Sequence, residues 1–276
     1  MQIGNNVQQY DSSVYVNLNK SLDRISAGTQ TSAAENPAAL AIATELKADS
    51  SGVAQAVENT SNAIAAVQIG DQALGEQSGI LDQIRGNLLQ ASTDTTSDEG
   101  RQALLNETQD LLKSLNNIAS STNYNGQTLL QNSQSDTSGS EVLQFQAGES
   151  SEDLIDTDSV QSNTEGLGLE DLLNQDSSTF DASTARSFLD TIDSAIDTVN
   201  SYRSDLGSTQ NQLQSSMSSL MTQYTETTSA TSTIQDVDYA QEVANFSKQN
   251  ILAQVGAYAA AQSNNINQNV VNRLLT

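Results

Sequence analysis

The chain has 276 residues, of which 34 are acidic and 10 are basic, so its formal net charge is −24. A surface of this sign repels phosphate groups, which argues against nucleic acid as a partner. Cysteine and histidine are both absent, and with them the thiol nucleophile, the commonest catalytic base and the commonest metal ligands. We therefore expect no enzyme activity, no metal site and no bound cofactor.

The first predicted element is a nearly neutral amphipathic helix within residues 1–47, which carry four acidic and three basic side chains. The N-terminus lacks the basic start and apolar run of a cleavable secretory signal. No segment of the chain approaches the roughly 18 uncharged apolar residues that cross a bilayer, so we expect no membrane insertion. The apolar side chains of this first helix recur at helical spacing at Ile3, Val7, Tyr10, Val14, Leu18, Leu22 and Ile25.

A long helix is predicted from about Pro37 to Gln90, because no proline interrupts the segment after its start. Its apolar residues step alternately by four and three positions, which is the seam pattern of a coiled coil. At 1.5 Å per residue the helix is about 80 Å long, so it needs a partner of similar length. Arg85 also falls on the seam, and we expect its head to reach solvent along its stem, in preference to being buried against a carboxylate of the partner helix. The main seam positions are Ile64, Val67, Leu74, Leu81 and Leu88.

The partner helix is predicted between residues 189 and 224, where the same alternation of steps returns. Arg203 and Gln210 occupy seam positions, and polar seam residues fix the register of a coiled coil at a cost in stability. A shorter helical run lies between residues 104 and 118. Three such helices predict an antiparallel bundle. The seam of the returning helix consists of Ile192, Ile196, Val199, Leu206, Leu213 and Leu220.

Residues 120–185 have a different pattern. Tyr124-Asn125-Gly126 is a turn signal, and residues 142–147 partly alternate like a strand. No lysine or arginine lies between Lys113 and Arg186, and 12 acidic residues fall in that interval. We interpret the segment as a small β-hairpin excursion with solvated Ser/Asp loops, not as a second core.

The last predicted element is a helix within residues 232–276, which carry three acidic and two basic side chains. Each terminal arm thus has a net charge of −1, and the middle of the chain holds the remaining −22. Two such apolar helices still expose apolar surface when they pair with each other, so we expect them to need neighbouring molecules. The apolar positions of this helix are Val243, Phe246, Ile251, Val255, Tyr258, Ile266, Val270 and Leu274.

Three stretches resemble a known family. NLNKSLDRISAGTQTSAAENPAALAIATELKA, at residues 17–48, closely resembles the N-terminal signature of bacterial flagellins. DVDYAQEVANFSKQNILAQVGAYAAAQSNNINQNVVNRLLT, at residues 236–276, is similar to their C-terminal signature. NYNGQTLL, at residues 123–130, is similar to the turn before the hairpin in the same family. Two long signatures at opposite ends, in the right order, are far more specific than any short motif.

The resemblance implies a mainly α fold, in which the terminal helices pair and a rod of long antiparallel helices carries a small β-hairpin. It implies an inner domain of residues 1–42 and 234–276, and a rod domain of residues 43–233. The β-hairpin and acidic Ser/Thr-rich loops are expected at about residues 123–185. Too few residues lie between the hairpin and the returning helix for large outer domains, so a minimal member of the family is expected.

The resemblance also implies a secreted structural subunit, exported by the flagellar type III route, that self-assembles into the filament used for swimming. An export chaperone, a filament cap and junction proteins are partners expected from the family. Two alternatives remain at this point. A hook–filament junction protein shares both terminal signatures, and a secreted coiled-coil adhesin acts as a monomer and forms no fibres.

Flagellins are also sensed by a Toll-like receptor through the rod. Glu107 of this chain matches the family's receptor-contact glutamate, but Gln83 and Asn87 stand where receptor-active members usually have Arg and Leu. A planar cation and an apolar anchor are the side chains that contribute most at protein interfaces. We therefore expect weak receptor recognition.

Overall fold

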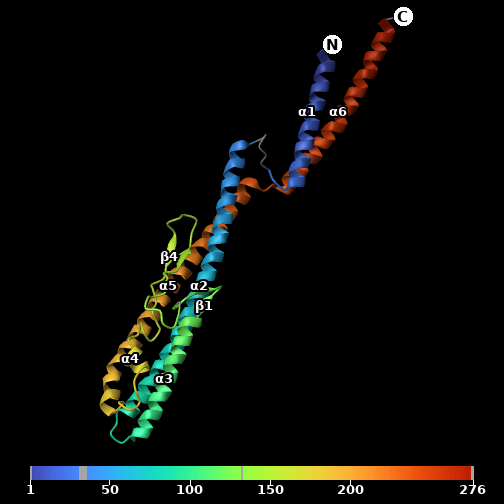
Figure 1. The fold of residues 1–276 in the computed structure, drawn as a ribbon. Coiled ribbons are helices and arrows are strands. Elements are labelled where there is room, and N and C mark those ends of the chain that lie inside the picture. The colour runs from blue at the N-terminus through green and yellow to red at the C-terminus, as the bar shows by residue number, and fades with distance from the viewer. Residues whose placement is uncertain (1, 31–35, 132, 275–276) are drawn as a thin grey trace. The chain divides into compact units, whose positions relative to one another are not determined.

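The computed structural model describes residues 2–30, 36–131 and 133–274, and most of them are helical (Figure 1). The prediction of a mainly α fold is confirmed. Its helices are α1 (Gln2–Ala27), α2 (Pro37–Ala91), α3 (Asp98–Ser121), α4 (Glu170–Leu173), α5 (Ala182–Gln235) and α6 (Tyr239–Leu274). Its strands are β1 (Asn123–Tyr124), β2 (Gln127–Thr128), β3 (Gln144–Gln146) and β4 (Leu154–Asp156).

The chain folds into two compact units. The rod unit comprises residues 51–224, and the terminal unit comprises residues 1–50 together with 225–276. Helices α2 and α5 contribute to both units, because each runs through one of these boundaries. None of the described helices is long and apolar enough to cross a membrane.

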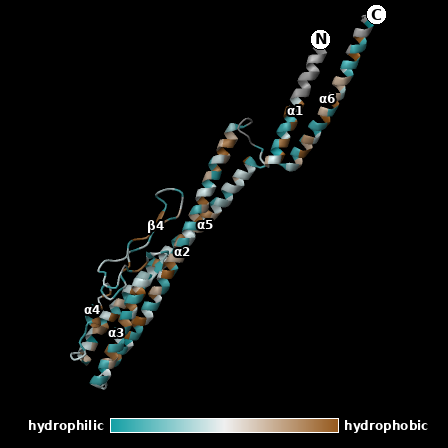
Figure 2. Cartoon of the chain, turned by 45° about the vertical axis from the view of Figure 1, so that its right-hand side comes forward, coloured by the Kyte–Doolittle hydropathy of each residue, from teal (hydrophilic) through white to brown (hydrophobic). Residues whose placement is uncertain are grey.

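The rod unit is built around one apolar seam shared by α2, α3 and α5, which run side by side (Figures 1 and 2). The alternating three- and four-residue spacing places one apolar side chain per turn on the same face of each helix. Two further buried residues, Val53 and Leu220, form a small separate cluster with Ala56. The largest fully buried side chains on the three helices are Leu74, Leu81, Ile84, Leu88, Leu105, Leu112, Leu115, Ile192 and Leu213.

Local capping explains where two rod helices begin. The Ser97 hydroxyl accepts a hydrogen bond from the backbone N–H of Gly100 at 3.1 Å, which caps the N-terminus of α3. At the start of α5 the backbone N–H of Thr184 donates to the Asp181 carboxylate at 2.7 Å. That hydrogen bond lowers the pKa of Asp181 below its ordinary value, since it stabilises the ionised form.

Both short strand pairs are antiparallel hairpins. Tyr124 pairs with Gln127, and the two residues between them, Asn125 and Gly126, have φ values of 52° and 83°. Positive φ at both central residues is the condition for a type I′ turn, for which Asn-Gly is the preferred sequence. The turn signal therefore specified this hairpin. The second pair, β3 with β4, begins within the segment whose alternation predicted a strand.

The segment between the hairpin and α5 packs more closely than the sequence indicated. Leu130, Leu169 and Leu172 are fully buried in the rod core, so solvated loops describe only part of this segment. Apolar residues spaced irregularly through a polar stretch carry no periodic signal, which explains the error. The acidic side chains do lie at the surface: apart from the half-buried Asp136, all of those from Glu141 to Asp181 are exposed.

Replacing Leu81 with alanine tests the seam. Leu81 has 0% exposure, and truncating a fully buried leucine lowers the free energy of unfolding by about 2–5 kcal/mol, because contacts are lost and a cavity remains. Urea unfolding followed by circular dichroism at 222 nm measures this change. The matched control is Gln68→Ala on the exposed side of α2, which should shift stability by less than about 0.5 kcal/mol. Equal effects of the two variants would contradict the assigned seam.

Candidate functional site

The terminal unit buries very little of itself. Helices α1 and α6 lie against each other and run antiparallel (Figure 1). Among the residues of this unit whose side chains are described, only Ser21, Ala43, Glu242 and Ala253 are buried. A helix pair this poorly covered has little core of its own, so its order depends on a few contacts and on whatever covers its exposed faces.

The face of α6 that turns toward α1 is made of small and polar residues. Its least exposed positions repeat with steps of four and three, as in a coiled-coil seam. They are Glu242, Phe246, Gln249, Ala253, Gly256, Ala260 and Ser263, and Asn250 beside Gln249 is half-buried as well. Phe246 is the one large apolar side chain among them, and the other six have little apolar bulk with which to hold α1.

Most of the large apolar side chains of α6 are exposed. Ile251 is 61% exposed and Tyr258 is 79% exposed. Hydrophobic residues recur along α6 between hydrophilic ones (Figure 2). We call this surface the outer face of α6, and it consists of Tyr239, Val243, Ile251, Leu252, Val255, Tyr258, Ile266 and Val270.

The predicted terminal-helix positions divide between the two faces. On α1, Val14, Leu18 and Ile25 are half-buried, whereas Leu22 is exposed. On α6, Phe246 is half-buried, and the predicted positions Val243, Ile251, Val255, Tyr258, Ile266 and Val270 are exposed. Leu274 lies in the last turn of α6, and its side chain is outside the described set, as are those of Ile3, Val7 and Tyr10.

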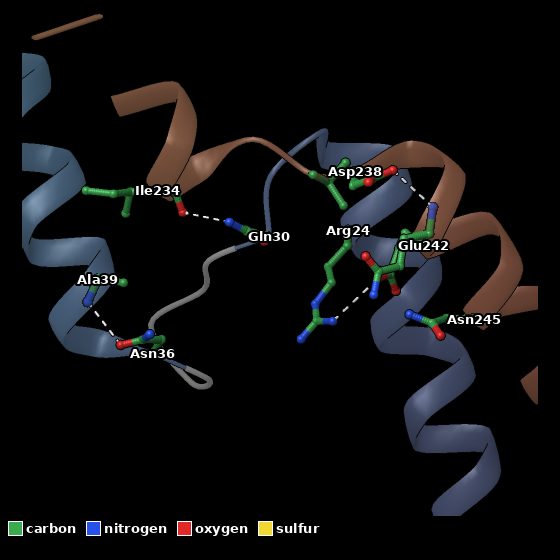
Figure 3. Close-up of a pocket in the computed structure, with 10 residues that line it drawn as sticks. Arg24, Gln30, Asn36, Ala39, Ile234, Asp238, Glu242 and Asn245 are labelled. Carbon is green, nitrogen blue, oxygen red and sulfur yellow. Dashed lines mark hydrogen bonds and ion pairs between the residues drawn. The ribbon is translucent and has the colours of Figure 1, made fainter. Parts of the chain in front are cut away.

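A polar contact that sequence analysis missed joins α1 to α6. The Ser21 hydroxyl donates a hydrogen bond to the Glu242 carboxylate and lies 3.4 Å from the Glu242 carbonyl oxygen. The Arg24 guanidinium is 3.7 Å from the other carboxylate oxygen of Glu242 (Figure 3). The sequence did contain a signal for this contact. Glu242 is an acidic residue at a seam position of α6, one heptad before Gln249.

The chain segments at the base of this helix pair are also joined. Thr29 and Asp236 form an isolated antiparallel β-bridge, supported by the N–H of Gln30 donating to the Gln235 carbonyl at 2.7 Å. Gly28 has a φ of 70°, which lets the chain turn out of α1 at this point. A polar groove of about 630 Å³ lies beside the bridge, lined by residues that include Arg24, Gln30 and Glu242 (Figure 3).

The predicted rod positions come together along the α2–α5 seam. Ile64 and Ile196 are half-buried, and the other predicted seam residues are buried. These buried residues are Val67, Leu74, Leu81, Leu88, Ile192, Val199, Leu206, Leu213 and Leu220.

Polar seam residues pair across the two helices. Arg203 lies 3.0 Å from Asp71, and Arg85 lies 2.6 Å from Asp193. The Arg85 side chain stays 45% exposed, so it both reaches solvent and pairs with the returning helix. The hydrogen bond that Arg85 donates to the Asp193 carboxylate raises the pKa of Arg85.

Every basic side chain in the described part of the rod unit has an acidic partner within that unit. Besides Arg85 and Arg203, the pairs are Arg101 with Asp98, Lys113 with Asp110, and Arg186 with Asp94. The unit carries 25 acidic and five basic side chains, a net charge of −20. Its surface therefore offers many carboxylates and no basic group that lacks an acidic neighbour. Within the described residues, no three His, Cys, Asp or Glu side chains group in a way that could hold a metal ion.

The three predicted receptor positions lie in the rod unit. Gln83 and Glu107 are exposed, on α2 and α3 respectively. Asn87 is half-buried, and its Nδ2 atom is buried without a hydrogen-bond partner. The amide of Asn87 is thus turned inward and presents little to an approaching protein.

Comparisons with known proteins agree on one family. A model described as the bacterial flagellin N-terminal helical region matches residues 2–135, and one described as the bacterial flagellin C-terminal helical region matches residues 189–274. A flagellin of Halalkalibacterium halodurans is 31% identical over 267 residues, covering 94% of this chain and 93% of the relative. A flagellin of Bacillus subtilis is 29% identical over 279 residues, covering 92% of each chain.

Solved structures give the same fold. The crystal structure of Bacillus cereus flagellin superposes with a TM-score of 0.51 and 26% identity, covering 59% of this chain and 88% of that one. A putative flagellar hook-associated protein from Vibrio parahaemolyticus superposes with a TM-score of 0.60, covering 72% of this chain and 99% of that one. Because the two sequences are only 14% identical, this match supports a shared fold and nothing further.

Proposed function

Because this chain belongs to the bacterial flagellins and is a structural subunit of the flagellar filament, we propose that the outer face of α6 is the surface through which copies of it assemble. The flagellins are a structural family and not an enzyme family. The observation that carries the proposal is the exposure of the large apolar side chains of α6. Burying one such side chain stabilises an assembly by about 1.5–3 kcal/mol.

Helix α1 contributes to the same assembly. Tyr15, Val16 and Leu22 are exposed on it, so the pair of helices presents apolar side chains from both of its members. The association also has a cost, since ordering side chains and losing rigid-body freedom oppose it. Several large side chains per copy are therefore needed, and α6 supplies them over most of its length.

We propose two domains from the sequence. The inner domain, residues 1–42 with 234–276, contains the helices that assemble, and the rod domain comprises residues 43–233. We further propose an extracellular filament as the site of action. An export chaperone, a filament cap and junction proteins are proposed partners on the strength of the family. The junction-protein and adhesin hypotheses are not favoured, since flagellin relatives match nearly the whole chain.

Polar substitutions on the outer face test the assembly surface. The triple variant Ile251→Ser, Val255→Ser, Tyr258→Ser should raise the critical concentration for seeded elongation by at least about tenfold, because three exposed apolar side chains lose their burial between copies. Electron microscopy and sedimentation of protein seeded with filament fragments measure this. Removal of residues 237–276 should abolish elongation altogether.

The control is Gln262→Ser, at an exposed polar position of the same helix. It should elongate like the unsubstituted protein. Circular dichroism should show that the rod helices persist in every variant. Normal filaments from the triple variant would refute the proposed surface.

The charge of the rod unit should make assembly depend on ionic strength. Copies that stack in a filament bring together units with a net charge of −20, in which basic side chains already have acidic partners. The Debye length falls from about 30 Å at 0.01 M salt to about 8 Å at 0.15 M. We therefore expect seeded elongation to be much faster at the higher salt concentration, with sucrose of equal osmolality as the control. Equal rates in the two buffers would show that rod repulsion does not limit assembly.

Recognition by a Toll-like receptor is proposed to be weak. Gln83 presents a neutral amide, Asn87 is turned inward, and Glu107 alone retains the family's side chain. The double variant Gln83→Arg, Asn87→Leu should increase the response of a receptor reporter cell line, and adding Glu107→Ala should reduce it again. A response of the unsubstituted protein equal to that of a standard enteric flagellin would contradict this proposal.

A further inference from the structure

We propose that Ser21, Arg24 and Glu242 form a register lock, a polar contact that fixes how far along α6 the helix α1 lies. The proposal rests on the proposed function, because the paired helices are the element that assembles. Ser21 and Glu242 are 221 positions apart in the chain, yet each is at least nine-tenths buried. They are two of only four buried side chains among the described residues of the terminal unit.

The register of this helix pair needs a specific contact because the facing surfaces have little individual shape. From Ala253 onward the face of α6 toward α1 is Ala253, Gly256, Ala260 and Ser263. A shift of one heptad places α1 against residues of nearly the same size. Apolar packing therefore distinguishes poorly between the observed register and its neighbours. The described large apolar side chains of α6 other than Phe246 lie on the outer face.

The Glu242 carboxylate does distinguish between registers. In the observed one it accepts a hydrogen bond from Ser21 and has the Arg24 guanidinium 3.7 Å away. In a register shifted by one heptad it loses both the Ser21 hydroxyl and the Arg24 guanidinium. A buried hydrogen bond to a charged group contributes about 1.5–3 kcal/mol, and the shifted register lacks it. Single polar residues at coiled-coil seam positions are known to select register in this way.

The β-bridge between Thr29 and Asp236 is the competing explanation. It joins the chain just beyond α1 to the chain just before α6, and it could hold the register without the lock. The experiment must therefore remove Glu242 while leaving every residue of the bridge unchanged, and a register shift then requires the bridge to open. The bridge is made by the backbone, so substituting Glu242 does not remove it.

The absence of native cysteine permits a direct measurement of register. Ser21 lies opposite Glu242, so Val14, one heptad earlier in α1, lies near Gln249, one heptad later in the antiparallel α6. The pair Val14→Cys, Gln249→Cys reports the observed register, and the pair Val14→Cys, Gly256→Cys reports a shift of one heptad. A short bismaleimide added to the full-length monomer in solution traps whichever pair is close. The readout is the ratio of the two cross-linking yields.

With Glu242 present, the observed register should dominate. The variant Glu242→Leu should change the ratio of the two yields by more than about tenfold toward the shifted pair, because leucine needs no polar partner on α1 and so does not select the observed register. Ser21→Ala should change it in the same direction. The matched control is Asp23→Leu, which introduces the same side chain at an exposed position of α1 and should leave the ratio unchanged. Circular dichroism checks that all variants keep their helices.

Several results would overturn the lock. One is a Glu242→Leu ratio equal to that of Asp23→Leu, which would assign the register to the β-bridge. Another is the absence of cross-linking in both reporter pairs of the protein that retains Glu242. Seeded elongation links the lock to assembly: Glu242→Leu should slow it by at least about tenfold, and normal elongation at an altered register would remove the lock from the assembly mechanism. The outer-face triple variant tests the proposed function separately, so the two failures are distinguishable.

Discussion

The structure depends on one imbalance: the terminal helices carry more large apolar side chains than they can cover by pairing with each other. Small residues fill the face of α6 toward α1, and residues such as Ile251, Val255 and Tyr258 stand on the opposite side. Water penalises that surface at roughly 25 cal/mol per Å². This arrangement suits a filament subunit, because apolar surface that is already buried within one copy cannot be buried between copies.

The rod unit has the opposite design. Its seam buries leucine and isoleucine on three helices, and its basic side chains already have acidic neighbours. The unit therefore has a core of its own and presents a strongly negative surface. Apolar attraction at the terminal helices and repulsion among rods oppose each other, and salt shifts the balance between them. We propose that this balance confines assembly to the terminal helices.

Several features followed directly from residue patterns. The three- and four-residue steps identified α2 and α5 as long partners, since a seam narrower than a globular core needs a second helix of similar length. The Asn125-Gly126 turn was specified by the positive φ angles that only such residues adopt readily. Burial was not predicted where buried residues follow no regular spacing. Leu130, Leu169 and Leu172 are buried in the rod core although their segment has no hydrophobic periodicity. Their burial is visible only in the tertiary structure.

The sequence by itself determined the helical class, the seam of the rod, the hairpin turn and the uneven distribution of charge, because each of these depends on local spacing or composition. The tertiary structure decided which side of α6 faces α1, that Asn87 turns inward, and that Ser21 meets Glu242. These depend on contacts between segments up to 221 positions apart. In α6, both small residues and large apolar residues recur at helical spacing. Periodicity alone therefore could not distinguish the face toward α1 from the outer face.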